Sequence, residues 1–453
     1  MIRSTTAGMA PSSTLTSSQE ALDRACESLV CGDSSTMRVL PYHLPLVADR
    51  GEGSRLWDVD GNEFIDLNMA YGPLILGHCP PQVIESVLRQ MSEHGSQLGF
   101  PTEVSTRVAE KIKMLYPSID LLRFTSTGTE ATTGAVRLAR TVTGKPKMIQ
   151  FEGHYHGSSD TVFNRYHAPL SDLPAKGYGP AIPGTSGING APHEVYVVRW
   201  NDIDAFLACL EELGDSVAGC IMEPVAGNTG VIPPKPGFLH QLREITLDHD
   251  MLMIFDEIIT SSRVAPGGAQ EYYDVQPDIS VVGKAIGGGY PLGCVGASKE
   301  IMEVVRDGTL FQGGVYSGNA VVMAAAEAVL DVILAEKEDM YSHLHAVGDQ
   351  LADGVREIFS RNGIPHVVQN VGPMVSMFLT KEDREGLYEY RDLRKYCDFD
   401  KYIAFQHALQ RAGIYFHPNQ FEPLFLSRAH SRADIDTVLE RIDAEVPCCF
   451  NKN

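Results

Sequence analysis

Positive charge is scarce in this sequence. Its 37 lysines and arginines stand against 58 aspartates and glutamates, which gives a formal net charge of −21. Proteins that bind nucleic acids obtain much of their affinity from basic patches, so this balance argues against a nucleic acid partner. A local basic pocket for a small anion remains compatible with it. Apolar runs of the length that crosses a bilayer are absent as well, so we expect no membrane partner.

Cysteine pairs of the CxxC type and zinc-ligand spacings are missing too. The nine cysteines are scattered along the chain. We therefore expect reduced thiols, mostly small core residues, in a cytoplasmic protein without a metal site. The stretch Met1–Glu20 is rich in serine and threonine and lacks the apolar segment of a secretory signal. We expect it to be a mobile tail.

The N-terminal quarter of the chain contains helical and hairpin patterns. The predicted elements are a helix over Gln19–Leu29, a hairpin over Arg55–Leu67 and two amphipathic helices that follow it. In the first amphipathic helix, Val83, Val87, Leu88 and Met91 share one face. We expect this face to pack against the rest of the protein.

Strands and helices then alternate up to about residue 300. The predicted strands are Leu122–Thr125, Met148–Phe151, Val195–Val198, Gly219–Met222, Leu252–Phe255 and Ile279–Val282. The helical patterns between and after them are Ala131–Arg140, Ile203–Leu213, Phe238–His249 and Ala320–Leu334. This order predicts an α/β fold with a mostly parallel sheet and helices on both faces. In such sheets ligands bind beyond the carboxyl ends of the strands.

The chain is long enough for two or three packed units. We expect residues 1–70 to form a tail and a segment that packs with a small domain. Residues 71–334 form a large ligand-binding domain, and residues 335–453 form the small α+β domain. The segment Gly157–Pro192 is rich in glycine, proline, serine and asparagine. A loop of that length is usually a lid, a binding loop or disordered.

Lys284 directly follows a strand and Gly283, before three further glycines. Lysines are rarely buried unless they are paired or used chemically. An amine in a desolvated pocket forms Schiff bases with carbonyl compounds or with pyridoxal phosphate. Taken alone, a loop lysine in a glycine-rich turn is an equally good interpretation. Asp256 ends another strand of the same sheet, although capping is the commoner role for such a carboxylate. Together the two match a pyridoxal phosphate site, which needs an acid for the pyridine nitrogen and a lysine.

Three further segments supply what this cofactor requires. Thr127, Gly128 and Thr129 lie between a strand and a helix start, where N–H groups and hydroxyls bind a phosphate, or where the threonines cap the helix. Tyr155 follows a strand and can stack on the pyridine ring. Asn228 follows another and can donate to the phenolic oxygen.

His154 and His156 flank Tyr155 two residues apart. That spacing permits a metal in principle. Core packing or hydrogen bonding is the better interpretation, since no matching cysteine or histidine cluster accompanies them.

The order of motifs carries a family resemblance from about residue 35 to residue 445. The matching stretches are Leu56–Asn62, Gly77–His78, Thr127–Ala131, Tyr155–Gly157, Glu223–Val225, Phe255–Glu257 and Gly283–Lys284 with its following glycines. With these the chain resembles the class III (subgroup II) pyridoxal-phosphate aminotransferases, in particular the glutamate-1-semialdehyde aminomutase group and related β-amino-acid aminotransferases. The resemblance implies a homodimer of the pyridoxal-phosphate transferase fold type I, with the active site near the subunit interface.

The resemblance also implies roles for the cofactor residues. Lys284 becomes the lysine that binds pyridoxal phosphate covalently and shuttles the proton, and Asp256 the partner of the pyridine nitrogen. Pyridoxamine phosphate is the other cofactor form in the half-reaction. A glycine and threonine of the neighbouring subunit reach the phosphate in this family. Here they correspond to Gly314 and Val315, so the threonine hydroxyl is lost.

The substrate side follows from the same resemblance. Ser35 and Arg38 correspond to residues that hold a substrate carboxylate, for which an arginine fork is suited. Tyr71 stands where the aminomutase group has a tryptophan, and Glu422 matches a glutamate that faces its active site. The small-molecule substrate is then an amino acid, keto acid or aldehyde. Aminotransferase is the first interpretation and aminomutase the alternative; a racemase or a non-catalytic cofactor-binding protein is less favoured.

Overall fold

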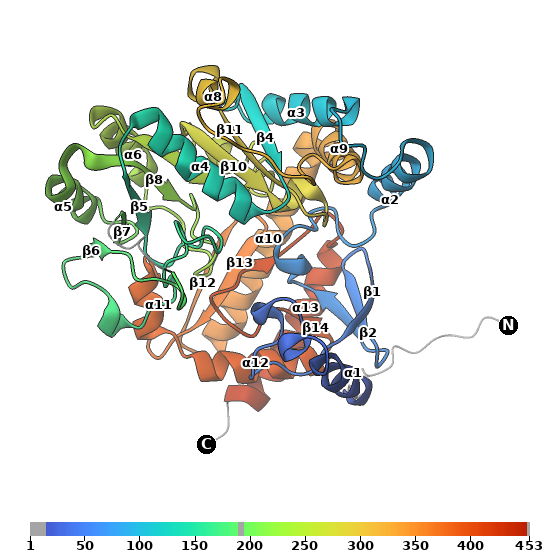
Figure 1. Cartoon of the computed structure of the whole chain (residues 1–453). Coiled ribbons are helices and arrows are strands. Elements are labelled where there is room, and N and C mark those ends of the chain that lie inside the picture. The colour runs from blue at the N-terminus through green and yellow to red at the C-terminus, as the bar shows by residue number, and fades with distance from the viewer. Residues whose placement is uncertain (1–14, 189–193, 451–453) are drawn as a thin grey trace.

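The computed structural model describes residues 15–188 and 194–450. Its largest sheet has eight strands in the order β4-β11-β10-β9-β8-β5-β7-β6. Figure 1 shows this sheet in the upper part of the molecule. Its strands are β4 (Leu121–Thr125), β5 (Lys147–Phe151), β6 (Tyr178–Pro180), β7 (Val195–Val198), β8 (Val217–Met222), β9 (Leu252–Asp256), β10 (Ile279–Gly283) and β11 (Gly293–Ala297). Strands β6 and β11 run in the direction opposite to the other six strands of this sheet. The mostly parallel sheet and all six predicted strands are confirmed.

The sequence prediction omitted β6 and β11. Strand β11 contains Gly293 and Gly296, which lower strand propensity. A side chain at Gly293 would collide with the backbone oxygen of Thr127, so the glycine permits close approach to the segment before α4. This requirement arises from tertiary packing and leaves no strand pattern in the sequence.

Helices cover both faces of the sheet. The covering helices are α2 (Pro81–Arg89), α3 (Glu103–Leu115), α4 (Gly128–Thr143), α5 (Ile203–Leu213), α6 (Phe238–Asp248), α8 (Lys299–Arg306) and α9 (Ala320–Ala335). Helices α4 and α8 pack with Val281 and Ile254 on one face. The other helices pack on the opposite face, α5 and α6 with Met253 and α2, α3 and α9 with Val282. The four helices predicted within and after the sheet are confirmed as α4, α5, α6 and α9.

The smaller part of the molecule lies below this sheet in Figure 1. It contains β12 (His366–Val371), β13 (Met374–Leu379) and β15 (Leu424–Phe425) as a three-stranded sheet, with α10 (Lys337–Arg361), α11 (Tyr390–Tyr396), α12 (Phe399–Arg411) and α13 (Arg432–Phe450). A second sheet joins β1 (Ala48–Glu52), β2 (Arg55–Asp58) and β3 (Glu63–Asp66) to β14 (Ile414–Tyr415). The predicted hairpin is thus β2–β3, and β14 pairs parallel with β3. Residues near 415 therefore lie beside the N-terminal segment.

The first helix begins earlier than predicted. It is α1 (Thr16–Cys26), whereas the sequence pattern placed it at Gln19–Leu29. The Asp60 carboxylate accepts the N–H groups of Ser17 and Ser18 at 2.7 and 2.9 Å, so a distant residue caps this helix. A tail up to Glu20 is therefore wrong for residues 15–20. Residues 1–14 of the predicted tail lie outside the described residues.

The cysteines are less buried than expected. The free thiols include Cys26, Cys31, Cys79, Cys209, Cys220, Cys294, Cys397 and Cys448. Of these, only the four between residues 209 and 397 are buried, so the prediction of mostly core cysteines is wrong. Within residues 15–188 and 194–450, no helix combines the length and apolarity needed to cross a membrane.

Candidate functional site

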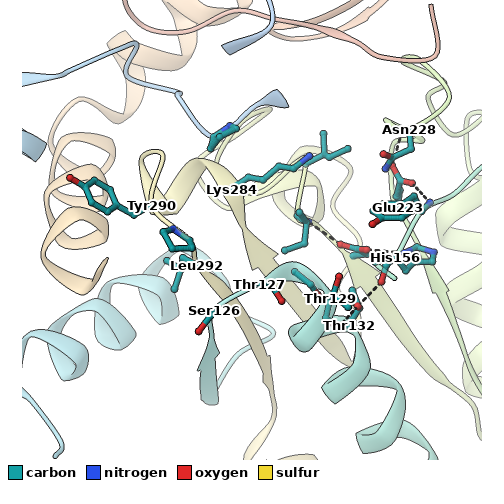
Figure 2. Close-up of a pocket in the computed structure, with 18 of the residues that line it drawn as sticks. Ser126, Thr127, Thr129, Thr132, His156, Glu223, Asn228, Lys284, Tyr290 and Leu292 are labelled. Carbon is teal, nitrogen blue, oxygen red and sulfur yellow. Dashed lines mark hydrogen bonds and ion pairs between the residues drawn. The ribbon is translucent and has the colours of Figure 1, made fainter. Parts of the chain in front are cut away.

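The carboxyl edge of the central sheet opens into a cavity of about 420 Å³. Strand β9 ends at Asp256, Lys284 follows β10, and α4 begins at Gly128 after β4. Figure 2 shows Lys284 reaching toward Glu223 and Asn228, with Thr127 and Thr129 at the start of α4. The predicted residues that line this cavity are Thr127, Gly128, Thr129, Tyr155, Asn228, Asp256 and Lys284. Residues more than 150 positions apart in the sequence thus meet in one place.

Lys284 occupies a backbone conformation that few lysines adopt. Its φ is 40°, in the left-handed region, where non-glycine residues concentrate at functional sites. Burial lowers the pKa of the amine, while the negative charges of Glu422, Glu223 and Asp256 oppose that shift. The net direction is downward, which favours the neutral, nucleophilic amine.

Asp256 is buried and held by two hydrogen bonds. The Nδ1–H of His156 donates to Oδ2 at 2.8 Å, and the backbone N–H of Ile258 donates to Oδ1 at 3.1 Å. His154 accepts the backbone N–H of Glu223 through Nδ1 at 3.0 Å. The interpretation of both histidines as hydrogen-bonding residues is confirmed, and His156 fixes the carboxylate that faces the cavity.

The start of α4 combines helix capping with an anion-binding geometry. The Thr127 hydroxyl accepts the N–H of Glu130 at 3.1 Å, and the Glu130 carboxylate accepts the N–H groups of Ser126 and Thr127. Capping by Thr127 is therefore real. Among the described residues no backbone partner reaches the next two N–H groups, those of Gly128 and Thr129. Both lie in the first helical turn, where a phosphate is bound by N–H groups and the helix dipole.

Glu223 organises the two loops on the far side of the cavity. It accepts the backbone N–H of Tyr155 at 2.8 Å and those of Gly227 and Asn228 at 2.7 and 3.1 Å. Burial raises the pKa of Glu223, and these N–H bonds oppose the rise. One carboxylate thus positions the backbones of both Tyr155 and Asn228.

The long loop after Tyr155 packs over this side of the site. Within its described part, the ring of Tyr166 lies 5.0 Å from that of Tyr155. The His167 ring nitrogen Nε2 donates to the backbone oxygen of Asn228 at 2.8 Å, and its ring stacks on Phe421 at 4.3 Å. Tyr166 and His167 therefore pack against the loops that carry Tyr155 and Asn228. The remainder of the predicted loop, after residue 188, includes residues outside the described part.

The four substrate residues expected from the sequence lie outside the cavity lining. Ser35 donates its backbone N–H to Asp33 at 2.9 Å, and the Arg38 guanidinium pairs with the same carboxylate at 3.2 Å. The Arg38 side chain is 58% exposed. Tyr71 donates its hydroxyl to the backbone oxygen of Met37 at 3.1 Å, so it adjoins the Arg38 segment.

Glu422, which lies in the segment between β14 and β15, interacts electrostatically with Lys284. It is half-buried, and desolvation raises its pKa from the ordinary 4.5 to about 7, although Lys284 opposes the rise. The charge of Glu422 also raises the pKa values of Tyr42, Tyr71 and Tyr166. Glu422 therefore interacts electrostatically with the phenol groups of these three tyrosines.

Gly314 and Val315 do not line this cavity. They line a different one of about 770 Å³, together with Gln97 and Phe100, and the side chain of Val315 is 80% exposed. Within one chain these two residues make no contribution to the site around Lys284.

Sequence reasoning missed several residues that line the cavity. They are Pro73, Ser126, Thr132, His156, Gly157, Glu223, Ile258, Ile259, Gly289, Tyr290, Pro291 and Leu292. Residues 289–292 continue the glycine run after Lys284, so their position next to the lysine was a usable signal. Thr132 faces the site through helical periodicity and donates to the His156 backbone oxygen at 2.6 Å.

Three comparisons with known proteins agree with this geometry. Residues 37–444 match the family model described as aminotransferase class-III. A glutamate-1-semialdehyde 2,1-aminomutase from Persephonella marina is 41% identical over 404 residues, 88% of this chain and 90% of that protein. The structure of an omega-transaminase from Sphaerobacter thermophilus has a TM-score of 0.88 and 30% identity, covering 97% and 98% of the two chains. A β-phenylalanine aminotransferase from Variovorax paradoxus has a TM-score of 0.83 and 27% identity, covering 96% of this chain and 94% of that one.

The raised pKa of Glu422 leads to a prediction about stability. Because the folded protein favours protonated Glu422, the stabilisation is complete below pH 4.5 and is lost as pH rises through about 7. Glu422→Gln removes this dependence. As the pH rises from 4.5 to about 7, the melting temperature of the cofactor-free wild type should therefore fall relative to that of the cofactor-free variant. The exposed Glu338→Gln is the control, and a variant whose melting curve follows wild type at every pH would contradict the assignment.

Proposed function

Because the chain belongs to the class-III aminotransferase family, we propose that it moves an amino group to or from a small carboxylate-bearing amino acid, keto acid or aldehyde. The family consists of pyridoxal-phosphate enzymes. One observation carries the proposal: Lys284, Asp256 and the start of α4 line a single cavity. An amine, an acid and an anion-binding helix end are the groups that this cofactor requires.

The residues of the cavity fit pyridoxal phosphate. The N–H groups of Gly128 and Thr129 would hold the phosphate, Asp256 would hold the pyridine nitrogen, and Tyr155 and Asn228 would contact the ring and its phenolic oxygen. When bound, the cofactor supplies an aldehyde for an amine and an electron-withdrawing ring that stabilises charge on the substrate carbon.

The protein groups then supply proton transfer and orientation. Burial lowers the pKa of Lys284 Nζ, which favours an amine that can accept a proton and return it to a neighbouring carbon. His156 keeps Asp256 oriented through its Nδ1–H, and Glu223 keeps the Tyr155 and Asn228 loops in place. The loop over residues 157–188 excludes water from these groups.

Removal of Lys284 tests the cofactor assignment. Wild-type protein incubated with pyridoxal phosphate should show the visible absorption band of the lysine-linked cofactor, and Lys284→Ala should lack it. Lys299→Ala, an exposed lysine 15 positions further along, is the control and should keep the band. A colourless wild-type protein would disprove the proposal.

Intramolecular amino transfer is the second candidate. Glu422 matches a glutamate of the aminomutase group and couples to Lys284, and the long loop over the cavity favours retention of an intermediate. The relatives named as glutamate-1-semialdehyde aminomutases support it as well. Val315 and Tyr71 depart from the aminomutase pattern, so transamination remains our first proposal.

A single-substrate experiment distinguishes the two reactions. Glutamate-1-semialdehyde is supplied to the enzyme in its pyridoxamine form without a second substrate. A transaminase should show at most one turnover, because its cofactor ends in the aldehyde form, and then depend on an added amino donor. Continuous formation of 5-aminolevulinate without any acceptor would instead establish the aminomutase reaction.

We also propose that the protein acts as a homodimer in the cytoplasm. Large apolar side chains are exposed around the second cavity, on helix α2 and on the turn Gln90–His94 that follows α2; they are Leu88, Met91, Leu98, Phe100, Phe311, Val315 and Tyr316. The exposure of Leu88 and Met91 contradicts the expectation that their whole helical face packs within the chain. Exposed apolar patches of this kind are typical of interfaces. The dimer would bring Gly314 and Val315 to the partner's cavity, and the free thiols support a reducing compartment.

A charge in this patch should disrupt the dimer. Phe100→Glu should shift the protein from dimer to monomer in analytical ultracentrifugation and weaken cofactor retention, because Gly314 and Val315 would no longer reach the partner. Leu247→Glu changes an exposed apolar residue of α6 and should leave both unchanged. A wild-type monomer would refute the proposed assembly.

A further inference from the structure

The main chain at Met37 and Arg38 is held by three aromatic side chains, the nearby His43 and the more distant Tyr71 and His417. The backbone oxygen of Met37 accepts two hydrogen bonds, from the Tyr71 hydroxyl at 3.1 Å and from His417 Nε2 at 3.0 Å. The next backbone oxygen, that of Arg38, accepts from His43 Nδ1 at 3.1 Å. Two consecutive peptide oxygens are therefore fixed by three side chains.

The three rings also pack against one another. The His43 and His417 rings meet edge to face at 4.9 Å, and the Tyr71 ring lies 5.6 Å from His417. His417 is buried, with 1% of its surface exposed. The three packed rings therefore support the backbone of Met37 and Arg38, and each ring limits the movement of the next.

The orientation of His417 is determined by its second nitrogen. Nδ1 accepts the backbone N–H of Asn419 at 3.1 Å, so the proton of the neutral ring resides on Nε2 and is directed to Met37. Burial lowers the pKa of His417 to about 4, so the ring is neutral at physiological pH. Nε2 is consequently a constant donor to this carbonyl.

His417 also belongs to the turn that presents Glu422. The Asn419 backbone oxygen accepts the N–H of Glu422 at 2.9 Å. The same turn therefore contacts the Arg38 segment through His417 and carries Glu422, which interacts electrostatically with Lys284. Residues 417–422 thus link the Arg38 segment to Glu422.

The position of Arg38 depends on this support of its backbone because few contacts restrain its side chain. Its guanidinium is more than half exposed, and its ion pair with Asp33 at 3.2 Å lies at the surface. Exposed ion pairs restrain side chains weakly. An arginine that must meet a carboxylate in a defined place then depends on a rigid backbone beneath it.

We propose that His417 is a positioning residue that, with Tyr71 and His43, fixes the backbone of Met37 and Arg38 and so aims the Arg38 guanidinium at the carboxylate of the substrate. This inference rests on the proposed amino-transfer function. It assigns the three aromatic side chains a role in carboxylate selectivity rather than in general stability.

Two donors that differ only in a carboxylate test this role. β-Aminobutanoate carries one, and isopropylamine is the same amine without it; both are followed as amino donors by loss of the cofactor band. The variants are His417→Ala, His417→Gln, which keeps a donor near the Nε2 position, and Arg38→Ala as the reference. His343→Ala is the matched control, since His343 Nε2 bonds another backbone oxygen, that of His430, at 2.8 Å.

His417→Ala should raise KM for β-aminobutanoate about tenfold with kcat nearly unchanged, the size expected for one lost hydrogen bond. Isopropylamine kinetics should change less than about twofold, His417→Gln should restore most of the KM, and His343→Ala should resemble wild type. Equal loss with both donors, or full activity of His417→Ala with β-aminobutanoate, would overturn the proposal. If His417→Ala does not fold, Tyr71→Phe removes the other donor to the same oxygen and is judged by the same criteria.

Hydrogen–deuterium exchange gives a readout that does not depend on activity. Amides of residues 36–43 should exchange faster in His417→Ala than in wild type and at the wild-type rate in His343→Ala. Unchanged exchange in this segment would refute the proposal that His417 fixes this backbone, even if the enzyme is active. A wild-type protein that reacts with no amino donor would instead refute the proposed function, so the two failures are distinguishable.

Discussion

The burial of one amine among carboxylates is the constraint on which the site depends. Lys284 lies at the carboxyl edge of the sheet, where desolvation lowers its pKa and Glu422, Glu223 and Asp256 oppose that shift. A fully charged lysine would be a poor nucleophile, and a buried amine without nearby acids would bind a proton too weakly to move one. The opposing influences allow both tasks at one nitrogen.

Each of these carboxylates also has a separate mechanical role. Asp256 is oriented by His156, and Glu223 ties the loops of Tyr155 and Asn228 together. Glu422 arrives from the small domain through the pairing of β14 with β3, which brings the C-terminal part of the chain to the N-terminal segment. The fold of type I therefore builds its electrostatics from several elements, and movement of the small domain would alter the charge near the lysine.

The sequence predicted the large-domain strands and the cofactor side of the cavity because these features are local. A strand end followed by Asp256, Lys284 or Thr127 is visible in a few consecutive residues. The sequence prediction missed glycine-rich β11 and the early start of α1 because both depend on distant residues. The glycines of β11 are required by the nearby Thr127 backbone, and the start of α1 is capped by Asp60. The role of His417 is equally invisible in sequence, because it acts on a backbone oxygen 380 positions away.

Strand β11 has a consequence for the size of the ligand. It lies between β4, which leads to the start of α4, and β10, which leads to Lys284, while Asp256 ends the adjacent β9. Since neighbouring strands lie about 4.8 Å apart, the sheet sets roughly 10 Å between the ends of β4 and β10 and about half that between β10 and β9. The strand order thus works as a ruler that admits an elongated, flat molecule with its anion at one end. A shorter aldehyde could reach the amine or the helix end, but not both.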